Sequence, residues 1–159
     1  MEFGLEEDTH NRLKGMGWHM ANKCVLCNGE EETDGHLFMG CPSTLAVWKN
    51  VSGERDEVIQ LLQDQQDAMV VLKQWPKLQV PGLGSYIWTL LPYVVLWSVW
   101  SMRTDVIFQE EGFSVEAATM RVKATLWAWL AMLPESLKER SKHNFINLAR
   151  NWQAVLEPG

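Results

Sequence analysis

Apolar residues recur at helical spacing along most of the chain, and this pattern predicts a series of helices. A short helix over residues 10–14 is expected first, followed by one from Pro42 to about Val51 that Ser52-Gly53 ends. Residues 54–75 form either one long helix or two shorter ones, because the polar run 63–67 is a natural break. Its apolar stripe comprises Val58, Leu61, Leu62, Met69 and Leu72. No segment has the alternation of a strand, so the predicted fold class is all-α.

The most apolar stretch covers residues 80–102 and contains no charged residue. Its length alone would suit a membrane span. Proline, glycine and serine residues interrupt it, however, and helical spacing along one face favours a buried central helix that Gly112 ends. The face expected to be buried comprises Leu90, Tyr93, Val94, Trp97, Trp100, Thr104, Ile107 and Phe108. We therefore expect no contact with a membrane.

A further helix is predicted from the N-cap Ser114 to Leu133. Its apolar stripe includes Trp129, and a second apolar set containing Trp127 lies on another face. The helix thus has more apolar surface than one partner helix would cover. Either it is the hub of a helical bundle, or Trp127 and its neighbours belong to an interface.

Ser141 is expected to cap a last helix, whose apolar positions are Phe145, Leu148, Trp152 and Val155. The outer face of this helix carries Lys142, His143, Asn147 and Arg150, which form a mildly basic strip. A solvated polar face explains the strip more simply than a track for phosphates does.

Composition describes a folded protein with an unusual aromatic content. Of 159 residues, 47% are hydrophobic and 21% charged, and nine are tryptophan. The net charge of −6 argues against a general nucleic-acid footprint, which needs clustered positive charge. We divide the chain into a small module at residues 1–53 and a tryptophan-rich helical bundle at residues 54–159, packed together as one unit.

All three cysteines of the chain lie in an array with one histidine: Cys24-x2-Cys27-x8-His36-x4-Cys41. This residue set and spacing predict one zinc ion held by four protein ligands, with Thr33 capping the helix that carries His36. Because no position is left for water or substrate, the site is structural rather than catalytic. His19 is a minor alternative ligand. Since every cysteine is in this array, we expect an intracellular, reducing location, in the cytoplasm or the nucleus.

The array and its flanks resemble a known family. Cys24-x2-Cys27, Glu32-Thr33, His36-Leu37-Phe38, Cys41-Pro42 and Trp48 look like the zinc-binding domain at the C-terminal end of reverse transcriptases of plant non-LTR (LINE-type) retrotransposons. The preceding Thr9-x-Asn11-x-Leu13-x3-Gly17-Trp18 and the later Trp88-x3-Pro92-x4-Trp97-x2-Trp100-x2-Arg103 resemble segments that flank that domain. Of the polar and basic residues that usually follow the second tryptophan, only Arg103 is present.

The chemistry available favours binding over catalysis. No serine lies in a nucleophile sequence, and the paired aspartates of a polymerase active site are absent, so we expect no enzymatic activity and no catalytic residue. Residues 1–41 hold three basic and eight acidic side chains, which would repel phosphates. The expected function is contact with another protein or a second copy of the chain, with Trp127, Trp129, Lys142 and Arg150 as candidate interaction residues. Binding of single-stranded RNA or DNA by a zinc knuckle is the alternative.

Overall fold

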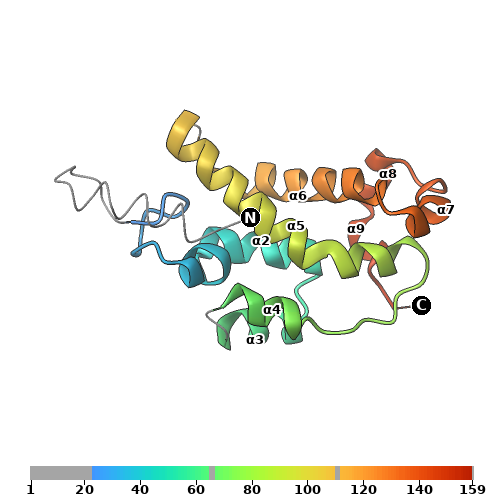
Figure 1. Ribbon diagram of the computed structural model, residues 1–159, viewed down its shortest axis with the longest axis horizontal. Helices are drawn as coiled ribbons and strands as arrows, with labels where there is room; N and C mark the ends of the chain where they lie inside the picture. Colours follow the sequence, from blue (N-terminus) through green and yellow to red (C-terminus); the bar gives the residue numbers. More distant parts are fainter. Residues whose placement is uncertain (1–22, 65–66, 110–111, 159) are drawn as a thin grey trace.

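The computed structural model describes residues 23–64, 67–109 and 112–158, and Figure 1 shows an elongated arrangement of helices. The elements are η1 (His36–Gly40), α2 (Pro42–Ser52), α3 (Asp56–Asp64), α4 (Ala68–Lys73), α5 (Leu83–Gln109), α6 (Val115–Leu130), η2 (Pro134–Ser136), α7 (Leu137–Arg140), α8 (Phe145–Arg150) and α9 (Trp152–Val155). The described residues contain no strand beyond one isolated bridge, between Lys23 and Glu31. The prediction of an all-α fold is confirmed. The expected helix over residues 10–14 and the alternative ligand His19 lie outside the described residues.

Three helices form the centre of the molecule. The long helix α5 packs along α6, and α2 contacts both of them. The helices α3 and α4 lie on one side of this centre, whereas α7 and α8 lie at the end of the long axis opposite the first described residues (Figure 1). One hydrophobic core runs through these elements from Cys24 to Leu156. The division of the chain at residue 53 stays a prediction.

Local sequence signals set most of the helix ends. Pro42 occupies the first turn of α2, and Gly53 ends that helix in the left-handed conformation at φ 79°. The Ser114 hydroxyl caps α6 by accepting a hydrogen bond from the Ala117 N–H. Asp67 caps α4 in the same way, so residues 54–75 form two helices separated at the polar run. The predicted cap at Ser141 is wrong, because the Asn144 side chain caps α8 instead.

Pro92 lies inside α5 and leaves one backbone carbonyl without its helical partner. A residue at position 92 would normally donate its N–H to the carbonyl of Trp88, but proline has no N–H. The indole N–H of Trp75 donates to that carbonyl at 3.1 Å, and the indole N–H of Trp88 donates to Pro76 O at 2.7 Å. A side chain from the connector thus replaces the missing helical hydrogen bond.

Tryptophan side chains form much of the core, and their polar atoms are satisfied there. The rings of Trp48 and Trp75 lie 5.7 Å apart, and those of Trp75 and Trp88 lie 4.9 Å apart. The buried Trp48 and Trp152 donate their indole N–H groups to the carbonyls of Phe38 and Val51. These rings therefore contribute apolar area without leaving a buried donor unpaired.

The predicted buried faces of two helices are wrong at several positions, although Val94 on α5 is buried and Leu72 on α4 packs against the core as expected. On α5, Tyr93, Trp97 and Phe108 are exposed, and the core is made by another face that includes Leu91, Val95 and Val99. On α4, Met69 is exposed and Val71 is buried in its place. Both helices are apolar on several faces, so spacing alone did not indicate which face the neighbouring elements cover.

The helix α5 is long and apolar enough to cross a membrane by length and composition. Its most apolar window has a mean hydropathy of 1.3, and 61% of that window is buried inside the fold. The core helix of a folded domain has the same properties, so the observation is weak support for a span. The absence of membrane contact stays a prediction.

Candidate metal centre

Residues 23–41, here called the metal loop, fold back on themselves to bring distant ligands together. The N–H of Cys24 donates to Glu30 O at 2.8 Å, and the N–H of Asn28 donates to Cys24 O at 2.7 Å. Asn28 adopts a positive φ of 55°, a conformation that asparagine tolerates better than most residues. These bonds form the tight turn that carries Cys24 and Cys27.

The second half of the loop uses a wide helical turn. Residues five apart on an α-helix point about 140° away from each other, so an ordinary helix would separate His36 and Cys41. The turn His36–Gly40 is instead a π-helix, closed by a hydrogen bond from the Cys41 N–H to His36 O at 2.6 Å. Thr33 accepts a hydrogen bond from the His36 N–H at 3.1 Å, as expected of a cap.

The four predicted ligand residues converge. The sulfur atoms of Cys24, Cys27 and Cys41 and a ring nitrogen of His36 all lie within 4.8 Å of one another. Cys24, His36 and Cys41 are buried, and Cys27 is partly exposed. This is a Cys3His group near the start of the described chain, with all four members supplied by one loop.

The distances fit a tetrahedral zinc ion. Zinc–sulfur bonds of about 2.3 Å give sulfur–sulfur edges of about 3.8 Å, and sulfur–nitrogen edges are about 3.5 Å. Cys24 Sγ and Cys41 Sγ lie 3.8 Å apart, and Cys27 Sγ and His36 Nε2 lie 3.3 Å apart. The residues and their separations are therefore consistent with one zinc ion.

The two nitrogens of the His36 ring face different surroundings. Nε2 lies on the side of Cys27 Sγ, whereas Nδ1 lies 3.4 Å from Glu30 Oε2. Metal-binding histidines commonly donate the other ring N–H to a carboxylate, which fixes the ring and raises the basicity of the binding nitrogen. The geometry makes Nε2 the ligand atom and Glu30 its orienting carboxylate.

A hydrogen bond between two of the buried thiols shifts their pKa values in opposite directions. The pKa of the Cys41 thiol is lowered, chiefly because the Cys24 thiol donates a hydrogen bond to it. The backbone N–H groups of Thr44 and Ser43, at the start of α2, lower that pKa further. The pKa of Cys24 is raised because Cys24 donates that hydrogen bond and is buried. Cys41 is thus the thiol most ready to bind metal as a thiolate.

A buried ion pair attaches the metal loop to α5. Arg103 is 1% exposed and Glu32 4% exposed, and the Arg103 Nε donates to Glu32 Oε1. The other oxygen of the same carboxylate accepts a hydrogen bond from the Val25 N–H at 3.3 Å. Glu32 therefore connects the turn between Cys24 and Cys27 to the central helix.

This ion pair was not among the sequence-based predictions, although the sequence contains a signal for it. Arg103 is the first charged residue after the uncharged stretch 80–102, and a charge at that place on a buried helix needs a partner. Its burial in the structure also removes Arg103 from the surface. Arg103 thus lies inside the fold, where it holds α5 to the metal loop.

The four candidate interaction residues lie away from the metal group, on α6 and on the segments after it. Trp127 is half-buried, with the Arg140 guanidinium 3.7 Å from its ring centroid and the Phe145 ring 6.3 Å away. Trp129 is also half-buried and packs against the core. Lys142 and Arg150 are exposed, and Lys142 pairs with Glu139 at 3.2 Å. Their part in an interface stays a prediction.

The helical fold and the Cys3His group together describe a helical domain with a candidate site for one zinc ion. Residues 6–48 match the model of the family described as zinc-binding in reverse transcriptase. The chain therefore carries a zinc-binding domain of the reverse-transcriptase type, which extends from residues outside the described part to Trp48 in α2. No curated protein matches the chain, and no solved structure does.

Proposed function

We propose that the chain is a non-enzymatic interaction module, derived from the tail of a LINE-type reverse transcriptase of plant origin. The matched family supports the reverse-transcriptase kinship at residues 6–48. The tryptophan-rich segment Trp88 to Arg103 supports the LINE-type assignment, because it resembles the segment that lies after the zinc-binding domain in those polymerases. The module acts through contacts with other proteins.

In this proposal the zinc ion is structural. The four ligands come from the protein and three of them are buried, so the bound ion would join the two halves of the metal loop and have no position open to substrate. The thiols must stay reduced to bind it, and this requirement supports a location in the cytoplasm or the nucleus. Zinc binding of this kind stabilises folding by about 10–16 kcal/mol in small domains at neutral pH.

The negative charge of the metal loop is the observation that favours a protein partner over a nucleic acid. Glu30, Glu31 and Asp34 are exposed on the metal loop, and the loop's one lysine or arginine is Lys23. Arg103 is held inside by Glu32. Nucleic acids bind through neutralisation of their phosphates, so an acidic loop beside a buried arginine disfavours that partner.

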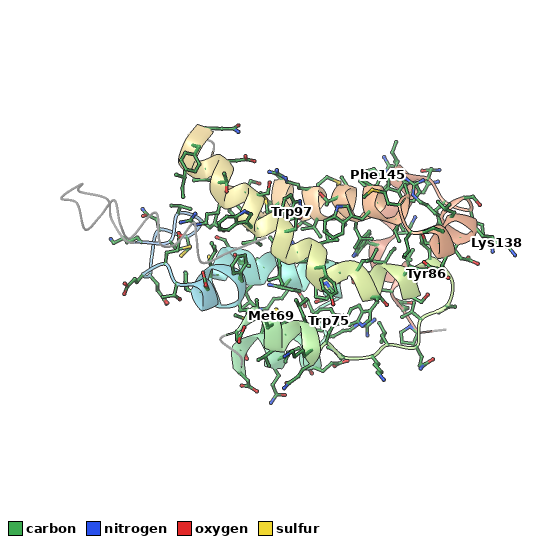
Figure 2. The ribbon with its side chains drawn as sticks, viewed as in Figure 1. Met69, Trp75, Tyr86, Trp97, Lys138 and Phe145 are labelled. Carbon is green, nitrogen blue, oxygen red and sulfur yellow. The ribbon has the colours of Figure 1, made fainter. Side chains whose placement is uncertain are left out.

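Binding of single-stranded nucleic acid is the second candidate, and one observation favours it. Tyr93 and Trp97 are exposed on the same side of α5, one helical turn apart, and exposed aromatic rings can stack on bases. Trp97 is 41% exposed and Tyr93 50% exposed; Figure 2 labels Trp97 on α5. Lys77 lines the same hollow as Tyr93, but one cation gives little electrostatic support for binding a strand of phosphates.

Fluorescence anisotropy with labelled single-stranded RNA and DNA, at low and at physiological salt, separates the two functions. We expect the chain to show no binding of RNA or DNA that strengthens steeply when the salt concentration is lowered. A steep salt dependence would contradict the proposal. If Trp97→Ala abolished such binding while the matched substitution Phe108→Ala on the same helix did not, base stacking would be the function.

A further inference from the structure

A groove with an acidic border opens where η1, α4 and α5 meet. It encloses about 350 Å³, and its apolar lining combines the exposed Met69 and the half-buried Leu72 with the almost fully buried Phe38 and Leu96. Among the described residues, the two polar ones that line it are both acids, Asp34 and Asp67. We call these six residues the acidic groove. Its size would admit one or two large side chains of a partner segment.

The apolar surface continues beyond this groove. A second hollow of about 390 Å³ lies along the seam between the connector 74–82 and α5, and it shares Leu72 with the acidic groove. Met69 is 55% exposed at the groove, and Tyr93 is exposed at the second hollow. Methionine adapts its shape to a partner more readily than branched side chains do. The two adjoining hollows therefore suit the apolar side of a helix from a partner molecule.

The opposite end of the molecule carries the complementary chemistry. Between residues 135 and 150 there are four cationic and two acidic side chains, on a chain whose net charge is −6. Ile146 is 63% exposed at the first turn of α8, and Leu137 is exposed on α7. With the exposed Lys138, Lys142 and Arg150, they form what we call the basic end.

One chain cannot bring these two surfaces together. Figure 2 shows Met69 and Lys138 far apart along the molecule, on elements that the packed helices α5 and α6 separate. Lys142 pairs with Glu139 within the chain, but exposed pairs of this kind contribute little and exchange readily. Any contact between the acidic groove and the basic end has to join two molecules.

We propose that the occupant of the acidic groove is the basic end of a second copy of this chain, with Ile146 seated against Met69 and Leu72. This proposal rests on the proposed function and names its partner. The two surfaces differ, so the contact is head to tail and leaves one groove and one basic end free in every dimer. Association therefore continues beyond the dimer, or closes in a ring, as concentration rises.

Two variants separate the halves of the contact. Met69→Lys places a cation in the acidic groove, and Ile146→Glu places an anion at the basic end; both side chains are exposed, so the fold should persist. Met120→Lys is the matched control, because Met120 is 47% exposed on α6 and belongs to neither surface. Zinc content and thermal melting, measured on each sample, verify that all variants are folded.

Light scattering across a concentration series gives the test. The unmodified chain and Met120→Lys should rise in weight-average mass from 18.3 kDa to more than twice that value, and the rise should diminish at high salt. Met69→Lys and Ile146→Glu alone should stay monomeric. Mixed in equal amounts they should form a dimer and nothing larger, because only one functional groove and one functional basic end remain to pair.

An unmodified chain that stays monomeric at every concentration would overturn the proposal, as would a mixture that stays monomeric. Tight binding of a synthetic basic amphipathic peptide by a monomeric chain would overturn it too and assign the groove to a foreign partner. Nucleic-acid binding is measured on the same samples. Steep salt-dependent binding there would defeat the proposed function itself, whereas its absence with a monomeric chain would defeat self-association alone.

Discussion

At the scale of single residues, the structure depends on polar atoms that find unusual partners. Trp75 donates to the Trp88 carbonyl that Pro92 leaves free, and Glu30 orients the His36 ring. Because proline has no N–H, the sequence alone indicated that Pro92 would leave one helical carbonyl without its usual partner. It did not indicate which side chain would satisfy the freed carbonyl, because Trp75 lies outside the helix and reaches Trp88 only after the connector folds back.

The substitution Trp75→Phe tests the first of these contacts. It keeps most of the ring but leaves the Trp88 carbonyl buried without a donor, which should lower the free energy of unfolding by about 1–3 kcal/mol. In a Pro92→Ala background the loss should be smaller, because the alanine introduced there has a backbone N–H that can bond the same carbonyl. Chemical denaturation of the four proteins in this cycle measures the difference. Equal losses in both backgrounds would contradict the account.

Glu30→Gln tests the second contact. The amide is a weaker acceptor for the Nδ1–H of His36, so the affinity for zinc should fall by about tenfold. Loss of an orienting carboxylate lowers metal affinity by about 10- to 100-fold, and the smaller value is expected because Glu30 is mostly exposed. Competition with a chelator of known affinity measures the change. Glu31→Gln, one residue along the exposed loop, is the control and should change the affinity little. An equal fall in both variants would show a general charge effect instead.

At the scale of elements, the boundaries of the helices were easier to predict from the sequence than their orientations were. Ser114, Gly53 and the break near residues 63–67 acted as expected, because caps and breakers work locally. The orientation of α5 was not predictable from its own residues, since it is apolar nearly all round. Its orientation depends on α6 and on the ion pair that joins Arg103 to the metal loop.

Replacing Arg103 by methionine should therefore destabilise more than the loop alone. It leaves the Glu32 carboxylate buried without its cation, and the free energy of unfolding should fall by about 3–5 kcal/mol. The double variant Arg103→Met with Glu32→Gln removes the buried charge and should recover part of the loss. Thermal and chemical unfolding measure both variants. A double variant no more stable than Arg103→Met would contradict the assignment of the cost to the unpaired carboxylate.

At the scale of the whole molecule, the metal group is part of the same core as the helices. Cys24 and Cys41 are buried in the cluster that contains Trp48, Val95 and Leu126. The four candidate ligands could be predicted from residue type and spacing alone. The contact through Glu32 and Arg103, and the packing of α2 against both α5 and α6, could not, because these depend on residues far apart in the chain.

Thermal melting of the purified chain, with and without a strong zinc chelator, tests the central claim most directly. Metal analysis should first find one zinc ion for each chain. Chelation should then lower the melting temperature by well over ~10 °C and loosen the metal loop and α2 before α5 and α6, because the ion joins the two halves of the loop. A chain that contains no zinc, or one whose melting curve is unchanged by chelation, would contradict the account.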